Sequence, residues 1–127
     1  MDKKIEILIV DDEIAIREDI GFLLKDKYAV ATAAGVEEAL YYMSDNHVDL
    51  VLLDIKMPKR NGITVFREIM KRYPETQVIF MTAHSTPEIS QDTLIHDAYG
   101  FIMKPFYSED LVRFVDEARK DSGRFKS

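Results

Sequence analysis

Aspartates stand directly after two short apolar runs of this chain, where a sheet would expose them at its edge. Asp11 and Asp12 follow Ile7–Val10, and Asp54 follows Leu50–Leu53. Two carboxylates about 4 Å apart repel by about 4 kcal/mol at an effective dielectric of about 20, so a group of them stays ionised only beside a cation. Oxygen ligands without His or Cys favour a hard divalent ion, and a small site favours Mg²⁺ over Ca²⁺.

Two further polar residues follow apolar runs in the same way. Thr82 comes after Val78–Met81, and Lys104 comes after Phe101–Met103. A metal ion held by carboxylates keeps open positions that can take phosphoryl oxygens, and Asp54 could then act as a nucleophile that forms an aspartyl phosphate. The Lys104 ammonium and the Thr82 hydroxyl could bind the remaining phosphoryl oxygens, because phosphoryl transfer depends mainly on positioning and charge compensation.

The elements that must position these residues alternate along the chain. A fifth apolar run is Tyr28–Ala33. Most of the five runs are apolar at every position, which is typical of strands covered on both faces of a parallel sheet. Between them lie apolar stripes with helical spacing: Ile16, Ile20, Leu23 and Leu24; Val36, Ala39, Leu40 and Met43; Phe66, Ile69, Met70 and Tyr73; and Leu111, Phe114, Val115 and Ala118. This alternation predicts an α/β fold of five βα units, a doubly wound parallel sheet.

The segment Pro87–Asp97 lacks a clean apolar stripe, but Thr86 and Pro87 resemble a helix N-cap followed by proline at the first helical position. We therefore predict a helix there as well. In such sheets the residues just past the strand ends converge on one crevice. If the strand order is 2-1-3-4-5, the first and third strands are neighbours, and their carboxylates meet where the winding reverses.

Composition excludes several classes of protein. The 127 residues are 46% hydrophobic and fit one domain with a sizeable core. The formal net charge of −6 argues against direct nucleic-acid or acidic-membrane binding. The chain has no cysteine, no apolar run of membrane-spanning length and no secretory signal. We expect a cytoplasmic domain over residues 1–121, followed by a polar tail or the start of a linker over residues 122–127.

Taken together, these motifs resemble the receiver domain of two-component response regulators, of the chemotaxis-regulator type. The resemblance extends from about Lys4 to about Lys120 and places every motif in order: Ile9-Val10-Asp11-Asp12-Glu13, Leu52-Leu53-Asp54-Ile55-Lys56-Met57-Pro58, Asn61-Gly62, Met81-Thr82-Ala83 and Lys104-Pro105-Phe106. Each motif alone is weak, whereas their combination at these spacings is specific. The family has a flavodoxin-like fold, and the strand order 2-1-3-4-5 is taken from this resemblance.

The resemblance implies a role for each matching residue. Asp54 is similar to the phosphate-accepting aspartate, and Asp11 and Asp12 to the acid pair that binds Mg²⁺ together with it. Lys56 would give its backbone carbonyl to the metal ion. Lys104 resembles the lysine that pairs with the acceptor and then with the phosphoryl group.

The resemblance also implies a conformational switch. Thr82 matches the switch hydroxyl, and Phe101 matches the aromatic residue whose ring turns inward when that hydroxyl moves. Pro105 would follow a cis peptide bond. Lys56 and His84 lie two residues past Asp54 and Thr82, at positions where members of this family tune the access of hydrolytic water. From this resemblance we also predict that they set the lifetime of the phosphorylated state.

The function expected from this resemblance is a phosphorylation-switched signalling module and not an enzyme. Its partners would be a sensor histidine kinase or a phosphotransfer protein, and a downstream effector or output domain. Its output surface would be the fourth helix, fifth strand and fifth helix, including Tyr99, Phe101 and Tyr107, and a phosphorylation-dependent homodimer through that face stays open.

Three alternatives stay open from the residues. A Mg²⁺ phosphohydrolase with an aspartate nucleophile typically carries a second acid two residues on, where this chain has Lys56. A flavodoxin-like cofactor binder needs a phosphate-binding loop after the first strand, where Asp11 and Asp12 would repel a phosphate. A receiver that no longer accepts phosphate and only scaffolds would not need the complete set of acids.

Overall fold

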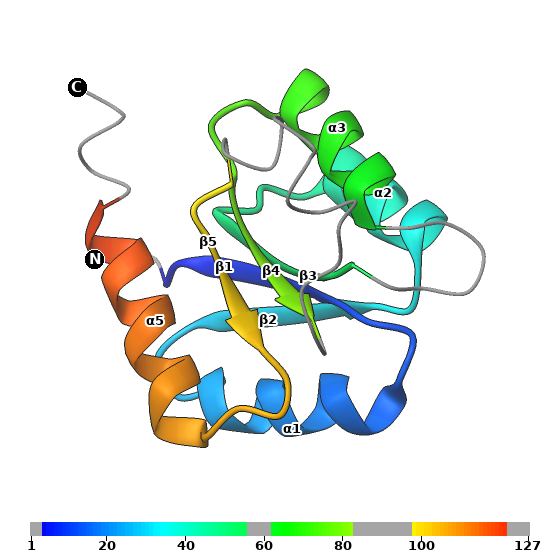
Figure 1. Ribbon diagram of the computed structural model, residues 1–127. Helices are drawn as coiled ribbons and strands as arrows, with labels where there is room; N and C mark the ends of the chain where they lie inside the picture. Colours follow the sequence, from blue (N-terminus) through cyan, green and yellow to red (C-terminus); the bar gives the residue numbers. More distant parts are fainter. Residues whose placement is uncertain (1–3, 56–61, 83–97, 122–127) are drawn as a thin grey trace.

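The structure is a computed structural model that describes residues 4–55, 62–82 and 98–121. These residues form a five-stranded sheet flanked by helices (Figure 1). The strands are β1 (Glu6–Val10), β2 (Ala29–Ala33), β3 (Leu50–Asp54), β4 (Gln77–Thr82) and β5 (Gly100–Met103). The helices among the described residues are α1 (Ile14–Leu24), α2 (Val36–Asp45), α3 (Gly62–Arg72) and α5 (Ser108–Asp121).

The predicted doubly wound sheet is confirmed. Its strand order is β2-β1-β3-β4-β5, and every neighbouring pair is parallel. Strand β1 pairs with β2 on one side and with β3 on the other, and Val10 lies opposite both Ala33 and Leu53. The chain therefore reverses its winding direction beside β1, and the carboxyl ends of β1 and β3 are neighbours.

Alternation along the central strands divides the apolar core into two layers. In β3, Val51 and Leu53 pack with α2 and α3, whereas Leu50 and Leu52 pack with α1 and α5. All of these side chains are buried, because successive strand residues point to opposite faces and helices cover both faces. Most of the runs of the sequence are apolar at every position because both faces of these strands are buried under helices.

The helices bury the stripes that their spacing predicts. On α5, Leu111, Val115 and Ala118 are buried against the sheet and Phe114 is half-buried. The stripe of α3 ends with the half-buried Tyr73, one residue past the last helical residue. Helices α1 and α5 cover one face of the sheet and α2 and α3 the other (Figure 1).

Several sequence predictions concern residues outside the described ranges. They are the helix over Pro87–Asp97, the backbone carbonyl of Lys56 and the side chain of His84. No helix in residues 4–55, 62–82 or 98–121 is long and apolar enough to cross a membrane.

Candidate functional site

The carboxyl edge of the sheet brings together the polar residues that follow β1, end β3 and β4, and follow β5. Asp11 is fully buried, and Asp54 and Thr82 are only 6% and 4% exposed. Asp12 is exposed, and Lys104 is partly buried. Buried polar groups need partners that compensate for their lost hydration, and a cluster of them at one edge of the sheet marks a candidate site for chemistry.

Asp11 is held by its own backbone and side-chain hydrogen bonds. Its N–H donates to the carbonyl of Ala33 at 3.1 Å, which continues the pairing of β1 with β2 by one residue. Its Oδ1 accepts the N–H of Glu13 at 2.9 Å, and Nη1 of Arg17 donates to its carbonyl oxygen at 2.7 Å. Sequence reasoning did not single out Arg17, although its place one turn after the acids was the available signal.

Asp54 is fixed by the neighbouring strand and by the start of α3. It lies opposite Met81 in the sheet, and the N–H of Ile55 donates to the carbonyl of Met81 at 3.1 Å. The N–H of Gly62 donates to the carbonyl of Ile55 at 2.6 Å. A Cβ at Gly62 would lie 2.5 Å from the carbonyl oxygen of Asp54. Position 62 therefore needs glycine because the backbone of α3 approaches Asp54 so closely.

Lys104 reaches back from the end of β5 to the acids. Its N–H donates to the carbonyl of Thr82 at 2.7 Å, and the Lys104–Pro105 peptide bond is cis, as predicted. Its Nζ lies 2.7 Å from Oδ2 of Asp11 and 3.8 Å from Oδ2 of Asp54. The lysine thus supplies one compensating charge to two buried carboxylates.

The charge state of Lys104 follows from these contacts. Burial by itself favours the neutral amine, but the hydrogen bond to Asp11 and the charges of Asp54 and Asp11 outweigh that effect. The pKa of Lys104 is therefore raised above its ordinary value, and the side chain stays a cation throughout the neutral range.

The predicted acidic cluster is assembled at this edge. Asp11, Asp12 and Asp54 each present a carboxylate oxygen within 4.8 Å of the others. One lysine does not balance three carboxylates, and an all-oxygen donor set suits Mg²⁺, which keeps several of its own waters. The residues present therefore fit the ion that the sequence predicts.

Phe101 and Thr82 lie on neighbouring strands near the same edge. Residue Thr82 pairs with Met103, and Phe80 pairs with Phe101. The Phe101 ring stacks on the buried Phe80 ring with centroids 5.5 Å apart, yet Phe101 remains 39% exposed. Its ring is thus in contact with the sheet and partly open to solvent.

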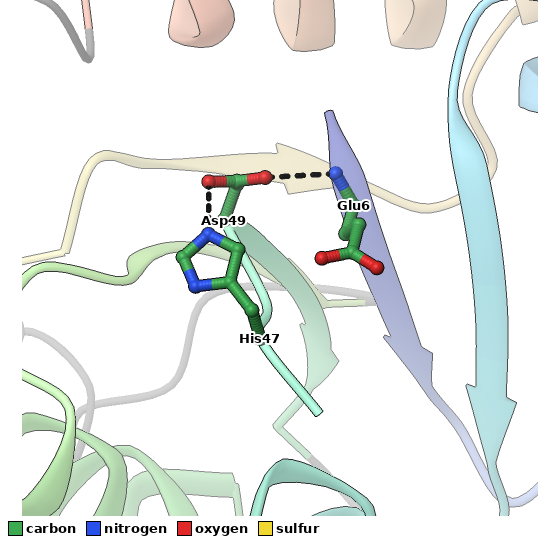
Figure 2. A group of neighbouring side chains, drawn as sticks. All are labelled: Glu6, His47 and Asp49. Atoms are coloured by element: carbon green, nitrogen blue, oxygen red, sulfur yellow. Dashed lines mark hydrogen bonds and ion pairs between the residues drawn. The ribbon is translucent and has the colours of Figure 1, made fainter. Parts of the chain in front are cut away.

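A second polar cluster lies at the opposite, amino edge of the sheet (Figure 2). Asp49 accepts the N–H of Glu6 at 2.9 Å through Oδ2, and its Oδ1 lies 2.7 Å from Nε2 of His47. The Asp49 N–H donates in turn to the carbonyl of Glu6. These bonds occupy both carboxylate oxygens of Asp49, and they join the starts of β1 and β3.

Comparison with known proteins agrees with this geometry. The model of the response regulator receiver domain family matches residues 7–116. The transcriptional regulatory protein DltR of Streptococcus agalactiae is 39% identical over 107 residues, which are 84% of this chain and 48% of that protein. The chain thus spans about half the length of this curated relative.

Solved structures share the fold over nearly the whole chain. A CheY-like receiver domain protein of Methanospirillum hungatei superposes with a TM-score of 0.90 at 30% identity, covering 96% of this chain and 98% of that one. A Thermotoga maritima response regulator, solved in complex with Mg²⁺ and BeF, gives a TM-score of 0.79 at 35% identity, covering 90% and 98%.

These comparisons give no support to a phosphohydrolase or to a flavodoxin-like cofactor binder, both of which the residues alone left open. The strand order, the acidic cluster at the carboxyl edge and the matched family all agree. The chain therefore belongs to the receiver domains of two-component response regulators, which act as signalling switches.

Proposed function

We propose that Asp54 accepts a phosphoryl group from a phosphohistidine of a sensor kinase or phosphotransfer protein. The observation that carries this proposal is the position of Lys104, whose Nζ lies within 4 Å of both Asp11 and Asp54 in a mostly buried pocket. A cation held between carboxylates at the end of a parallel sheet is suited to receive a third group of negatively charged oxygens.

In this proposal Asp11, Asp12 and Asp54 would hold Mg²⁺ together with the backbone carbonyl of Lys56. The acidic cluster supports the first three ligands, whereas Lys56 comes from the sequence alone. The ion would neutralise charge on the phosphoryl oxygens during transfer. The Mg²⁺ complex of the Thermotoga relative adds support by similarity.

The transfer itself needs little from the protein beyond positioning. A carboxylate oxygen of Asp54 forms the new P–O bond while the P–N bond of the donor histidine breaks, and the bonding pair leaves with the imidazole nitrogen. Lys104 then pairs with a phosphoryl oxygen, and the Thr82 hydroxyl donates to another. Self-phosphorylation from small phosphodonors and autodephosphorylation would follow from the same site.

The output surface proposed here surrounds β5. The exposed fractions of Phe101, Met103 and Tyr107 are 39%, 52% and 78%, so large apolar side chains face solvent along β5 and before α5. Movement of Thr82 toward the phosphoryl group would free space beside Phe101. The Phe101 ring would then turn inward. The surface would then bind an effector, an output domain or a second copy of the chain.

Helix α1 offers an apolar surface to a phosphodonor protein near Lys104. Ile14 and Phe22 of α1 are 61% and 70% exposed. A pocket of about 600 Å³ lies between α1 and the loop from β5 to α5, lined by Leu23, Phe106 and Lys104 among others. We propose that an apolar helix of the phosphodonor protein docks here, because this pocket opens next to the lysine that contacts the acceptor.

We also propose that residues 1–121 form the receiver, since α5 ends at Asp121, and that residues 122–127 are a polar tail or the start of a linker. A cytoplasmic location follows from this role.

Intact mass after incubation with acetyl phosphate tests the assignment. The wild-type chain should gain one labile phosphoryl group only with Mg²⁺, and Asp54→Asn should gain none. Asp45→Asn, which changes an exposed aspartate at the end of α2, is the matched control and should be phosphorylated like the wild type. Phosphorylation of Asp54→Asn, or no dependence on Mg²⁺, would overturn the proposal.

A further inference from the structure

A pocket of about 490 Å³ lies at the amino edge of the sheet, at the opposite end from Asp54. Three separate segments form it: the start of β1, the loop between α1 and β2, and the last turn of α5. Figure 1 shows the start of β1 near the end of α5, and Lys4 and Lys120, more than 100 positions apart in the sequence, both line the pocket.

The pocket is strongly basic, although the whole chain carries a net charge of −6. Lys4, Lys27, Arg119 and Lys120 line it, and Asp116 is its single acidic residue. The lining therefore has an excess of three positive charges. All four basic residues are exposed, so their ends can move toward a ligand without unfolding the chain.

The floor of the pocket is already organised. The buried Tyr28 donates a short hydrogen bond to Asp116, and Nζ of Lys27 lies 3.0 Å from Oδ2 of Asp116. Arg119 also interacts with Tyr28 and Asp116. Asp116 is thus occupied by neighbours on the protein, and its charge is compensated locally. Asp116 balances only one of the four positive charges of the pocket, and a bound anion from solution would reduce the repulsion among them.

We propose that this pocket binds a small anion with a diphosphate group, either free pyrophosphate or the diphosphate of a nucleotide. A diphosphate carries a charge of about −3 near neutral pH, which matches the excess charge of the lining. The volume falls within the usual range for small-molecule sites. Ile5 and Tyr28 add an apolar wall between the basic groups, against which a nucleoside could pack.

The pocket is separate from the phosphorylation site. Strand β1 runs from Glu6 beside the pocket to Val10 beside the acidic cluster, and its five residues span about 16 Å. The inference therefore does not depend on the proposed role of Asp54. Binding of a diphosphate would join β1, the α1–β2 loop and α5, and it would raise the stability of the folded chain.

Isothermal titration of pyrophosphate, ADP and adenosine into the full chain tests this proposal. The buffer contains EDTA, so that no metal ion can bridge an anion to the acidic cluster, and Asp54→Asn is titrated in parallel. We expect one saturable site for pyrophosphate and for ADP, with the same affinity in both proteins, and no binding of adenosine. Equal affinities for the two anions would indicate recognition of the diphosphate alone, whereas tighter ADP binding would indicate a nucleotide.

Two charge-matched double variants locate the site. Lys4→Gln with Lys120→Gln should weaken diphosphate binding about tenfold, because two ion pairs with the anion are lost. Lys71→Gln with Arg113→Gln changes the net charge equally on exposed parts of α3 and α5, and it should change the affinity by less than about twofold. Absence of a saturable site, or equal weakening by both double variants, would overturn the proposal, as would adenosine binding as tightly as ADP.

Discussion

Nζ of Lys104 lies 2.7 Å from Oδ2 of Asp11, although the two residues are 93 positions apart in the chain. The carboxylate of Asp11 is fully buried, and the lysine side chain is only 15% exposed. A buried carboxylate must be neutralised by a partner or must take up a proton. In this site Lys104 and the proposed Mg²⁺ would both compensate the negative charge of Asp11. The stability that Mg²⁺ restores when Lys104 is absent measures how far one can replace the other.

Replacing Lys104 by Met should lower the free energy of unfolding by about 3 kcal/mol without Mg²⁺, because Asp11 loses its partner while it stays buried. Saturating Mg²⁺ should restore more stability to this variant than it adds to the wild type. Urea unfolding with and without Mg²⁺ measures both effects.

The control for this variant is Lys27→Met, which removes the 3.0 Å ion pair with the more exposed Asp116. That change should cost less than about 1 kcal/mol. Equal costs for the two lysines would contradict the role given to burial around Asp11.

Replacing Gly62 by Ala should destabilise the chain by about 2 kcal/mol, because the new Cβ would lie 2.5 Å from the carbonyl oxygen of Asp54 and 2.8 Å from Cα of Ile55. The backbone of Asp54 would have to move, so phosphorylation by acetyl phosphate should slow at least several-fold. Thermal unfolding and the rate of adduct formation are the two measurements.

Gly21→Ala is the matched control, since a Cβ there meets only Cγ1 of Val30, at 3.8 Å. This position lies inside α1, where alanine is favoured over glycine by up to about 1 kcal/mol. The control should therefore be stabilised and phosphorylated at the normal rate. A loss of stability in Gly21→Ala comparable to that of Gly62→Ala would mean that close backbone approach is not the cause.

Tyr28 should make the fold sensitive to alkaline pH. Burial and the neighbouring Asp116 raise the pKa of Tyr28 from 10.0 to about 12. Its contribution to stability is full below pH 10, where both states are protonated. That contribution falls as pH rises toward 12, because only the unfolded chain releases the proton; the loss is roughly 2–3 kcal/mol.

Tyr28→Phe isolates this effect in urea unfolding from about pH 9 to about pH 12. Near neutral pH the variant should be less stable by about 1 kcal/mol, because it lacks the hydrogen bond to Asp116. At the alkaline end it should match or exceed the wild type. Other alkaline titrations, including that of Lys104, occur in both proteins and cancel. Parallel pH curves for the two proteins would be the contrary result.

Phe101→Trp would report the proposed inward rotation, because the chain has no tryptophan of its own. The side chain at position 101 is 39% exposed here. Acetyl phosphate with Mg²⁺ should shift the emission to shorter wavelength and reduce quenching by acrylamide. Adding Asp54→Asn or Thr82→Ala should abolish the shift. An unchanged spectrum in a chain that mass spectrometry shows to be phosphorylated would mean that this ring does not move.

Within residues 4–55, 62–82 and 98–121 the sequence was sufficient to predict the helices and strands, because each local pattern there has one dominant cause. Leu50–Leu53 is apolar at every position since helices cover both faces of the sheet, and the strand is found there. The strand order is different, because periodicity carries no information about which strands pair. That order came from resemblance to a family, and the four strand pairings confirm it.

The site was partly predictable for a similar reason. Residues at strand ends share an edge once the sheet is parallel, so Asp11, Asp54 and Lys104 could be grouped in advance. The hydrogen bond from Arg17 to the carbonyl of Asp11 and the contact between Gly62 and Asp54 depend on where helices enter the site. The basic pocket was not predicted, since its residues come from three distant segments with no shared motif.

The meeting of the start of β1 and the end of α5 has a consequence for engineering. Both described ends of the chain lie at the amino edge of the sheet, about the length of β1 away from the acidic cluster. A label, surface attachment or fused protein at either end would leave the carboxyl edge accessible. A short linker could also connect the two ends, so that a circularly permuted chain opened between α2 and β3 would keep Asp11, Asp54 and Lys104 together.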